Sequence, residues 1–267
     1  MILPAEIQQK ARHTGVRDQQ IEKDYVISWV LQAVAQHEQL SANLAFKGGT
    51  VLKKVYFDDY RFSEDLDFTL LDNRISNDEV VAWFDETFPY VREEANIPLD
   101  IVERNEHEDG GINFYIRFIG PLGGKGRNKK IKVDISRSEL LCCKPEKHSV
   151  LLSYSDQQEH QLLCYSLQEI LVEKMRSVMQ RMQARDFYDI WYLLEVYQMN
   201  PDYHISEFAV KCEAKGLKAS DFLEKLRERL PQYKGRWQHS MDAQIKQLPD
   251  FIQVERETMK KMRNLNL

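Results

Sequence analysis

Hydrophobic and polar positions divide the chain into three stretches of different texture. From Pro4 to about Leu40, apolar residues recur at helical spacing, which predicts helices. From about Leu44 to Leu141, short alternating runs predict strands mixed with helices. From about Leu162 onward the pattern is again helical and ends in a charged, amphipathic tail. We therefore predict an α+β fold, with a core and its N-terminal helices at residues 1–150 and a mainly helical C-terminal domain at residues 151–267.

Composition and charge narrow the class of protein. A chain of 267 residues with 43% hydrophobic residues is too apolar for a disordered protein and long enough for one or two domains. The longest apolar stretch, Tyr25 to Ala35, is too short to span a bilayer, and residues 1–10 lack the features of a secretory signal. We therefore expect a cytoplasmic protein without a membrane segment. A net charge of -5 argues against coating nucleic acid by bulk electrostatics, but it permits an enzyme that grips nucleic acid through a local basic patch.

The cysteines and histidines do not follow the spacings of metal sites. None of the four cysteines forms a C-x-x-C pair, and the seven histidines show no H-E-x-x-H spacing. We interpret the cysteines as reduced structural thiols and expect no zinc site. The cysteines are Cys142, Cys143, Cys164 and Cys212.

The segment from Phe46 to Leu70 carries the most informative polar pattern. It opens with Lys47-Gly48-Gly49-Thr50, a glycine turn that is followed by apolar residues at helical spacing. The free backbone N–H groups at such a helix start, together with the helix dipole, can receive a phosphate. These four residues are therefore candidate nucleotide-binding residues.

Two aspartates follow on a predicted strand in the same segment. Alternation places Leu66 and Phe68 on one side and Asp65 and Asp67 on the other, with the two aspartates about 7 Å apart along the chain. Carboxylates at close approach repel each other by on the order of 4 kcal/mol at an effective dielectric near 20. Mg²⁺ is the natural occupant, because it prefers one or two carboxylates together with substrate phosphates. An exposed strand often carries Asp-x-Asp without a function, but here the glycine turn at residues 47–50, a candidate phosphate-binding site that we call the phosphate seat, precedes the strand.

Residues 131–136 predict a strand that supplies a third carboxylate. This strand forms a hairpin with residues 114–119, and it places Lys132, Asp134 and Ser136 on one side. Beside the Asp65 strand, Asp134 would complete a triad that can hold two metals and accept a proton from a hydroxyl. The alternative is an ordinary acidic residue on an exposed strand.

The hairpin turn at residues 120–130 is rich in glycine and positive charge. Five cationic side chains lie between Lys125 and Lys132, but their spacing is not that of a P-loop. The turn is either a solvated hairpin tip or a clamp on a triphosphate or an RNA backbone.

A third group of charged residues lies in the helical pattern of residues 167–194. The predicted buried stripe consists of Leu167, Ile170, Leu171, Met175, Val178 and Met182. At its border lie Lys174, Arg181 and Arg185, which either snorkel to solvent or neutralise polyphosphate charge in a cleft. Asp186 either caps the next helix or takes part in catalysis.

A family resemblance rests on four segments: FKGGTVLKKVY, RFSEDLDF, KVDIS and EILVEKMRSVMQRMQARDFYDIWYLL. Together they resemble the AbiEii-type nucleotidyltransferase toxins of bacterial abortive-infection and type IV toxin–antitoxin systems, over roughly Ile21 to Leu194. The resemblance implies a polymerase-β-like nucleotidyltransferase core joined to a helical C-terminal domain, with the active site in the cleft between them. Members transfer nucleotides from an NTP with magnesium, some of them onto the acceptor end of tRNA. Members are usually encoded beside an antitoxin with a winged-helix DNA-binding domain.

The resemblance also implies a role for each matching residue. The glycine motif maps to Gly48, Gly49 and Thr50, and the metal-binding pair to Asp65 and Asp67. The lysine of the helical domain maps to Lys174, and its downstream aspartate to Asp186, with Asp189 as the competitor. The candidate catalytic residues are Asp65, Asp67, Lys174 and Asp186, joined by Asp134 on its strand pattern alone. Asp65, Asp67 and Asp134 would hold two Mg²⁺ ions. Together with the patterns described above, the candidate nucleotide-binding residues are Lys47, Gly48, Gly49, Thr50, Arg181 and Arg185.

The hypothesis is therefore a Mg²⁺-dependent nucleotidyltransferase toxin with tRNA or another RNA as the acceptor. Nucleotidylation of a protein is an alternative within this class. A metal-dependent nuclease or phosphodiesterase could use the same three carboxylates without the glycine turn. In a non-catalytic binding module, the acidic residues would be a surface feature only.

Overall fold

The computed structural model describes residues 1–124, 129–263 and 265. The chain forms two compact units. We call the first the sheet unit, and it comprises Met1–Glu139, Pro145–Tyr165 and Ala243–Lys246. We call the second the helical unit, and it comprises Leu140–Lys144, Ser166–Asp242 and Gln247–Leu267. The chain therefore crosses between the units more than once, whereas the sequence predicts a single boundary after residue 150.

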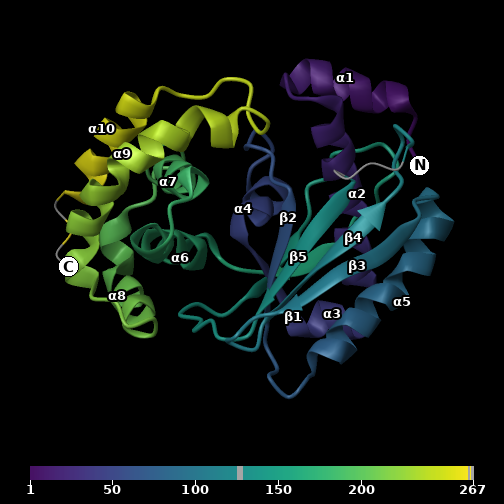
Figure 1. Ribbon diagram of the computed structural model, residues 1–267, viewed down its shortest axis with the longest axis horizontal. Helices are drawn as coiled ribbons and strands as arrows, with labels where there is room; N and C mark the ends of the chain where they lie inside the picture. The colour runs from purple at the N-terminus through teal and green to yellow at the C-terminus, as the bar shows by residue number, and fades with distance from the viewer. Residues whose placement is uncertain (125–128, 264, 266–267) are drawn as a thin grey trace. The chain divides into compact units, whose positions relative to one another are not determined.

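The sheet unit is built on a mixed β-sheet (Figure 1). Within the described residues this sheet has seven strands, in the order β3-β4-β5-β2-β1-β7-β6. The strands are β1 (Leu44–Lys47), β2 (Asp65–Leu70), β3 (Leu99–Glu106), β4 (Ile112–Phe118), β5 (Lys130–Ser136), β6 (Glu146–Ser149) and β7 (Gln161–Cys164). Strand β5 pairs antiparallel with β4 and parallel with β2. The predicted hairpin is confirmed, and β5 also lies beside the Asp65 strand, which is the condition on which the predicted carboxylate triad depends.

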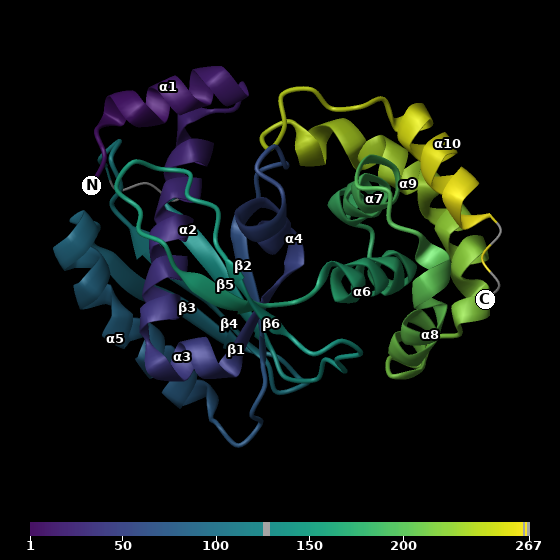
Figure 2. The same cartoon turned by 180° about the vertical axis from the view of Figure 1, so that it is seen from behind.

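The helices α2, α3 and α5 lie across one face of the sheet (Figure 2). The helices of this unit are α1 (Pro4–Thr14), α2 (Asp18–Gln36), α3 (Glu38–Asn43), α4 (Gly48–Val51) and α5 (Asn77–Ala95). The covered face is the apolar one, since Phe84 of α5 packs its ring 6.2 Å from Phe68 of β2 and 5.2 Å from Phe114 of β4. Burial of these rings fixes which side of β2 faces inward.

The helix after the glycine turn differs in type from the prediction. The α-helical part is only the single turn of α4, and the backbone then widens into a π-helix, η1 (Leu52–Tyr56). Two consecutive lysines of η1, Lys53 and Lys54, are buried, and Lys54 donates to Asp24 Oδ2 of α2 at 2.7 Å. The π-helix therefore buries two charged side chains, which an amphipathic helical pattern does not predict.

The helical unit packs around aromatic side chains. Its elements are α6 (Leu167–Gln180), α7 (Ala184–Trp191), the π-helix η2 (Tyr192–Val196), the 3₁₀ turns η3 (Pro201–His204) and η4 (Ala219–Asp221), α8 (Ile205–Glu213), α9 (Phe222–Met241) and α10 (Phe251–Met262). The ring of Phe187 in α7 stacks on Tyr233 of α9 with centroids 5.6 Å apart, and the ring of Phe251 in α10 lies 5.9 Å from Phe187. The predicted amphipathic tail is thus α10, which packs within its own unit. Met182 lies beyond the end of α6 and is only half-buried, so its assignment to the buried stripe is wrong.

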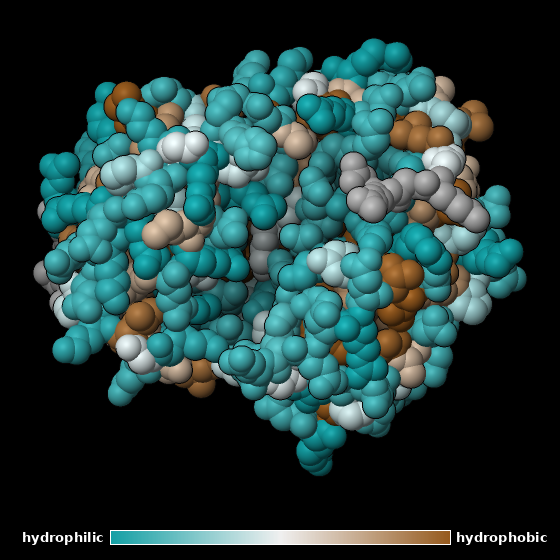
Figure 3. Space-filling view, viewed as in Figure 1, coloured by the Kyte–Doolittle hydropathy of each residue, from teal (hydrophilic) through white to brown (hydrophobic). Residues whose placement is uncertain are grey.

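The hydrophobicity of the helices, the molecular surface and the state of the cysteines can be compared with what the composition predicts. Among the described helices none combines the length and the apolar character needed to cross a membrane. The face in Figure 3 carries mostly hydrophilic residues, with hydrophobic ones in small groups. All four cysteines are free thiols, as expected.

Candidate active site

The face of the sheet opposite the phenylalanines carries a band of polar side chains. The strand register aligns one row across β1, β2, β5 and β4, and this row consists of Lys47, Asp67, Asp134 and Asn113. The neighbouring row across β2, β5 and β4 consists of Asp65, Lys132 and Tyr115. Because side chains alternate along each strand, both rows point to the same side of the sheet. The fold thus brings the three predicted carboxylates together on one polar face.

The ammonium group of Lys132 lies among these carboxylates. Its Nζ donates to Asp134 Oδ2 at 2.6 Å. Burial acts to lower the pKa of Lys132, but the carboxylates of Asp134, Asp65 and Asp67 outweigh burial and raise it above its ordinary value. In the part of the chain that the structure describes, no three acidic, histidine or cysteine side chains converge as a ready-made metal site. A protein cation therefore offsets the carboxylate repulsion at the place where the sequence predicts a metal.

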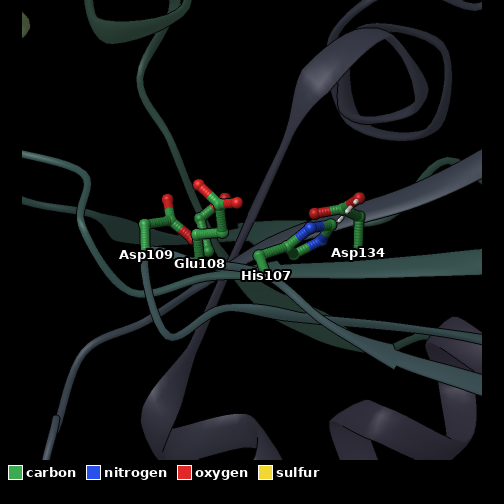
Figure 4. Close-up of a pocket in the computed structure, with 5 residues that line it drawn as sticks. His107, Glu108, Asp109 and Asp134 are labelled. Atoms are coloured by element: carbon green, nitrogen blue, oxygen red, sulfur yellow. Dashed lines mark ion pairs between the residues drawn. The ribbon is translucent and has the colours of Figure 1, made fainter.

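A hollow of about 440 Å³ lies beside Asp134 (Figure 4). Asp134 and Ser136 of β5 line it together with His107, Glu108 and Asp109 from the turn between β3 and β4. The imidazole of His107 points toward Asp134, with Nε2 3.7 Å from Asp134 Oδ2. Sequence reasoning missed these turn residues because they reach Asp134 only through the pairing of β4 with β5.

The glycine turn lies against the acidic face. Gly48 has a φ of 80°, a left-handed conformation that favours glycine, and a Cβ there would overlap Asp67 Oδ2. Thr50 is buried and donates its hydroxyl to the backbone oxygen of Asp65. The turn and the first residue of β2 are thus tied together, so the predicted phosphate seat adjoins the predicted metal ligands.

Two further residues border this turn, and sequence reasoning did not assign them a role. A Cβ on Gly49 would lie 2.6 Å from Arg61 Nη2 and 3.5 Å from Ser63 Oγ. Arg61 is only 2% exposed, although arginine is rarely buried in full. Both residues belong to the RFSEDLDF segment, but no periodicity distinguishes a buried arginine in a loop from a solvated one.

In the helical unit, Lys174 is buried between two aspartates. Its Nζ lies 2.6 Å from Asp186 Oδ1 and 2.8 Å from Asp189 Oδ2. Asp186 also accepts a hydrogen bond from Arg181 Nε at 2.7 Å. Burial acts to raise the pKa of Asp186, but the positive charges of Lys174 and Arg181 outweigh it and hold this pKa below its ordinary value. Both candidate aspartates therefore contact the lysine.

Two interpretations of this cluster need correction. Asp186 does not cap α7, since the N-cap position is Gln183 and no side chain caps the helix there. Lys174 does not snorkel to solvent, because it is 6% exposed. Arg181 keeps 57% of its side chain exposed while pairing with Asp186. Arg185 is half-buried and forms no ion pair within the described residues.

The predicted basic hairpin tip is described only in part. Lys125 and Arg127 lie outside the described residues. The other three cations each pair with a carboxylate: Lys129 with Glu22, Lys130 with Glu103, and Lys132 with Asp134. These three lysines are therefore engaged within the sheet unit.

Comparison with known proteins identifies the class and then the family. The fold resembles that of MenT4, a nucleotidyltransferase toxin from Mycobacterium tuberculosis H37Rv, with a TM-score of 0.71 at 20% identity over 100% of this chain and 91% of that chain. It also resembles JHP933 from Helicobacter pylori, with a TM-score of 0.56 at 18% identity over 88% of each chain. Residues 29–261 match the family model "Nucleotidyl transferase AbiEii toxin, Type IV TA system", so the chain belongs to this family. A search of curated proteins found no match. The predicted family, the α+β nucleotidyltransferase fold and the enzyme class are confirmed.

Proposed function

We propose that this nucleotidyltransferase toxin transfers nucleotides from an NTP to an RNA acceptor, with tRNA as the substrate class, in a Mg²⁺-dependent reaction. The observation that carries the proposal is the strand register. The register pairs Asp67 with Asp134, and Asp65 lies two residues before Asp67 on the same strand. The glycine turn lies against Asp67. A nuclease could use the carboxylates but has no need for this turn. The tRNA acceptor itself is inferred from the family resemblance.

Asp65, Asp67 and Asp134 would hold Mg²⁺ in a site of the two-metal type. Their carboxylate oxygens are the ligands that Mg²⁺ prefers, and the contact of the Lys132 ammonium with Asp134 supports a site for positive charge on this face. When bound, Mg²⁺ would supply the positive charge that stabilises the leaving pyrophosphate. Asp134 would accept the proton of the acceptor hydroxyl while the oxygen of that hydroxyl forms its bond to the α-phosphorus and the pyrophosphate leaves.

The remaining candidate residues would bind and neutralise the phosphates. Lys47, Gly48, Gly49 and Thr50 would line the phosphate seat. Lys174, with Arg181 or Arg185, would offset the charge that develops during transfer, and Asp186 would hold Lys174 in place. A type IV system also implies a cognate antitoxin as the partner of the toxin.

Labelling tests the proposed reaction. The purified protein is incubated with each α-³²P-labelled NTP, Mg²⁺ and total bacterial RNA, and RNA and protein are then separated on gels. Label on tRNA-sized bands, absent from an Asp65→Asn control, is the expected result and identifies the nucleotide. Label on protein bands would show that the acceptor is a polypeptide and not RNA. If the folded protein gives no label with any NTP, the proposed reaction is wrong.

The position of Lys132 leads to a prediction about metal binding. Replacing Lys132 by methionine removes the ammonium that competes for Asp134, so we expect the affinity for Mn²⁺, used as a probe for Mg²⁺, to rise roughly 3- to 10-fold without nucleotide. Electron paramagnetic resonance of free Mn²⁺ measures this affinity. Lys130→Met is the matched control, because Lys130 lies on the same strand but pairs with Glu103. An unchanged or weaker affinity in Lys132→Met would show that Lys132 does not compete with the metal.

A further inference from the structure

The helical unit contains a group of arginines where α9 packs against α6 and α7 (Figure 1). Nη1 of Arg229 donates to the backbone oxygen of Val178 at 3.0 Å, and Nη1 of Arg236 donates to the backbone oxygen of Met182 at 2.8 Å. These two carbonyls belong to the last turn of α6 and to the loop after it, where backbone oxygens lack partners within a helix. Each arginine therefore satisfies one carbonyl and is held in place by it.

The positive charges of these arginines are not neutralised by acidic side chains. In the part of the chain that the structure describes, neither Arg229 nor Arg236 forms an ion pair. Because a carbonyl oxygen carries no formal charge, its hydrogen bond orients a guanidinium without neutralising it. Arg236 is exposed and Arg229 is half-buried, so donors of both side chains remain within reach of a ligand. Arg185, three residues after Met182, adds a third charge without an ion pair.

Arg229 and Arg236 lie on one face of α9. At 3.6 residues per turn, seven residues bring the two side chains to within about 20° around the helix axis and about 10 Å along it. Tyr233 lies between them and also donates to the backbone oxygen of Val178, at 3.1 Å. Arg227 is an exposed arginine of the same helix, but it lies about 200° around the axis from Arg229. The helix therefore carries two arginines on this face and a comparable one on the opposite face.

This group contrasts with the acidic balance of the whole chain. The net charge of the chain is -5, yet the residues of the helical unit include more lysine and arginine than aspartate and glutamate. A cluster of arginines on one face is the electrostatic footprint of a nucleic-acid-binding surface. The group is therefore a local basic patch of the kind that the net charge of the chain permits.

We propose that Arg229, Arg236 and Arg185 form a surface that binds the phosphate backbone of the acceptor RNA, and we call it the arginine surface. The guanidinium fork matches phosphate oxygens, and an RNA strand presents a phosphate at every nucleotide. One stretch of backbone can therefore contact both arginines of α9. Such contacts position an RNA without reading its sequence. The inference rests on the proposed function, because that function supplies the RNA.

The salt dependence of tRNA binding tests the arginine surface. Binding of a fluorescent tRNA transcript is followed by anisotropy in EDTA, without nucleotide, between about 50 and 200 mM KCl. Arg236→Gln keeps an amide donor for the carbonyl of Met182 but removes the charge. We expect it to weaken binding about 3- to 10-fold and to lower the slope of log affinity against log salt by about 0.7 to 0.9, the value for one phosphate contact. The double variant Arg229→Gln/Arg236→Gln should lower the slope by about twice as much.

Arg227→Gln is the matched control. It removes the same charge from the same helix but from the opposite face, so its affinity and its slope should stay close to those of the wild type. Thermal unfolding of each variant measures its stability. A merely structural role of Arg236 would lower the melting temperature and leave the salt slope of the folded protein unchanged. If the double variant fails to fold, Arg236→Gln and Arg227→Gln decide the test.

Each outcome supports or overturns the arginine surface. The proposal is wrong if the wild type does not bind tRNA, if Arg236→Gln keeps the slope of the wild type, or if Arg227→Gln lowers it equally. If the wild type binds polyglutamate as tightly as tRNA and Arg236→Gln weakens both alike, the surface fits an acidic polypeptide and the choice of RNA is wrong. If the slope falls as expected but the wild type labels no RNA, the arginine surface is supported and the proposed transfer reaction fails.

Discussion

Asp65→Asn is expected to lower the rate of nucleotidyl transfer by about 10³-fold or more, because it would remove a charged ligand from the proposed metal site that would stabilise the leaving pyrophosphate. The fold should persist. The Asp65 carboxylate is half-buried and forms no hydrogen bond within the described residues, while its backbone oxygen still accepts from Thr50. Removing one of three neighbouring negative charges also relieves repulsion. Initial rates of label incorporation at saturating Mg²⁺ measure the effect, and thermal unfolding measures the stability.

Asp59→Asn provides the control for this substitution. Asp59 is an exposed aspartate in the loop between η1 and β2, so the same chemical change there should leave both rate and melting temperature close to those of the wild type. Full activity of Asp65→Asn would show that Asp65 is not a ligand of the proposed metal site. A melted or aggregated Asp65→Asn protein would show that the carboxylate has a structural role instead.

The local faces of the strands could be predicted from sequence, but their partners could not. Alternation alone assigns Asp65 and Asp67 to the side opposite Phe68, and the structure confirms this arrangement. The pairing of Asp67 with Asp134 depends on which strand lies next to β2, a long-range choice that periodicity does not encode. The environment of Lys132 could not be predicted for the same reason, because its ammonium group comes near the three carboxylates only when β5 pairs with β2.

The buried cations show a second limit of sequence patterns. A helical wheel places Lys174 at the border of the apolar stripe of α6, where a lysine ordinarily reaches solvent. It is buried because α7 supplies two aspartates, and a pattern within one helix carries no information about the next. Arg61 is similar, since its partner Gln244 lies in a segment far along the chain.

Lys174→Met is expected to lower the free energy of unfolding by about 3–5 kcal/mol, because removing one partner of a buried ion pair leaves the other charge uncompensated. Asp189 is fully buried, so its carboxylate cannot regain solvent in the folded protein. Arg181 still contacts Asp186, and therefore Asp189 should carry most of the cost. Equilibrium urea unfolding, followed by circular dichroism, measures the loss.

Two further variants locate the cause of this loss. Adding Asp189→Asn to Lys174→Met removes the buried carboxylate that has lost its ion pair with Lys174, so we expect the double variant to regain part of the lost stability. Arg181→Met breaks only a half-exposed ion pair and should cost about 1 kcal/mol or less. If Lys174→Met unfolds at the same urea concentration as the wild type, the triad does not stabilise the helical unit.

The same double variant separates stability from catalysis at Lys174. The family resemblance implies that Lys174 stabilises charge in the transfer reaction, and the loss of one such donor lowers the rate by about 10²- to 10³-fold. Because Lys174→Ala would also destabilise the protein, its rate alone cannot distinguish the two roles. The double variant Lys174→Met/Asp189→Asn should therefore be assayed at a temperature where it is fully folded. We expect its transfer rate to stay low although its stability recovers, since no charge replaces the ammonium. A rate that recovers together with stability would leave Lys174 with a structural role alone.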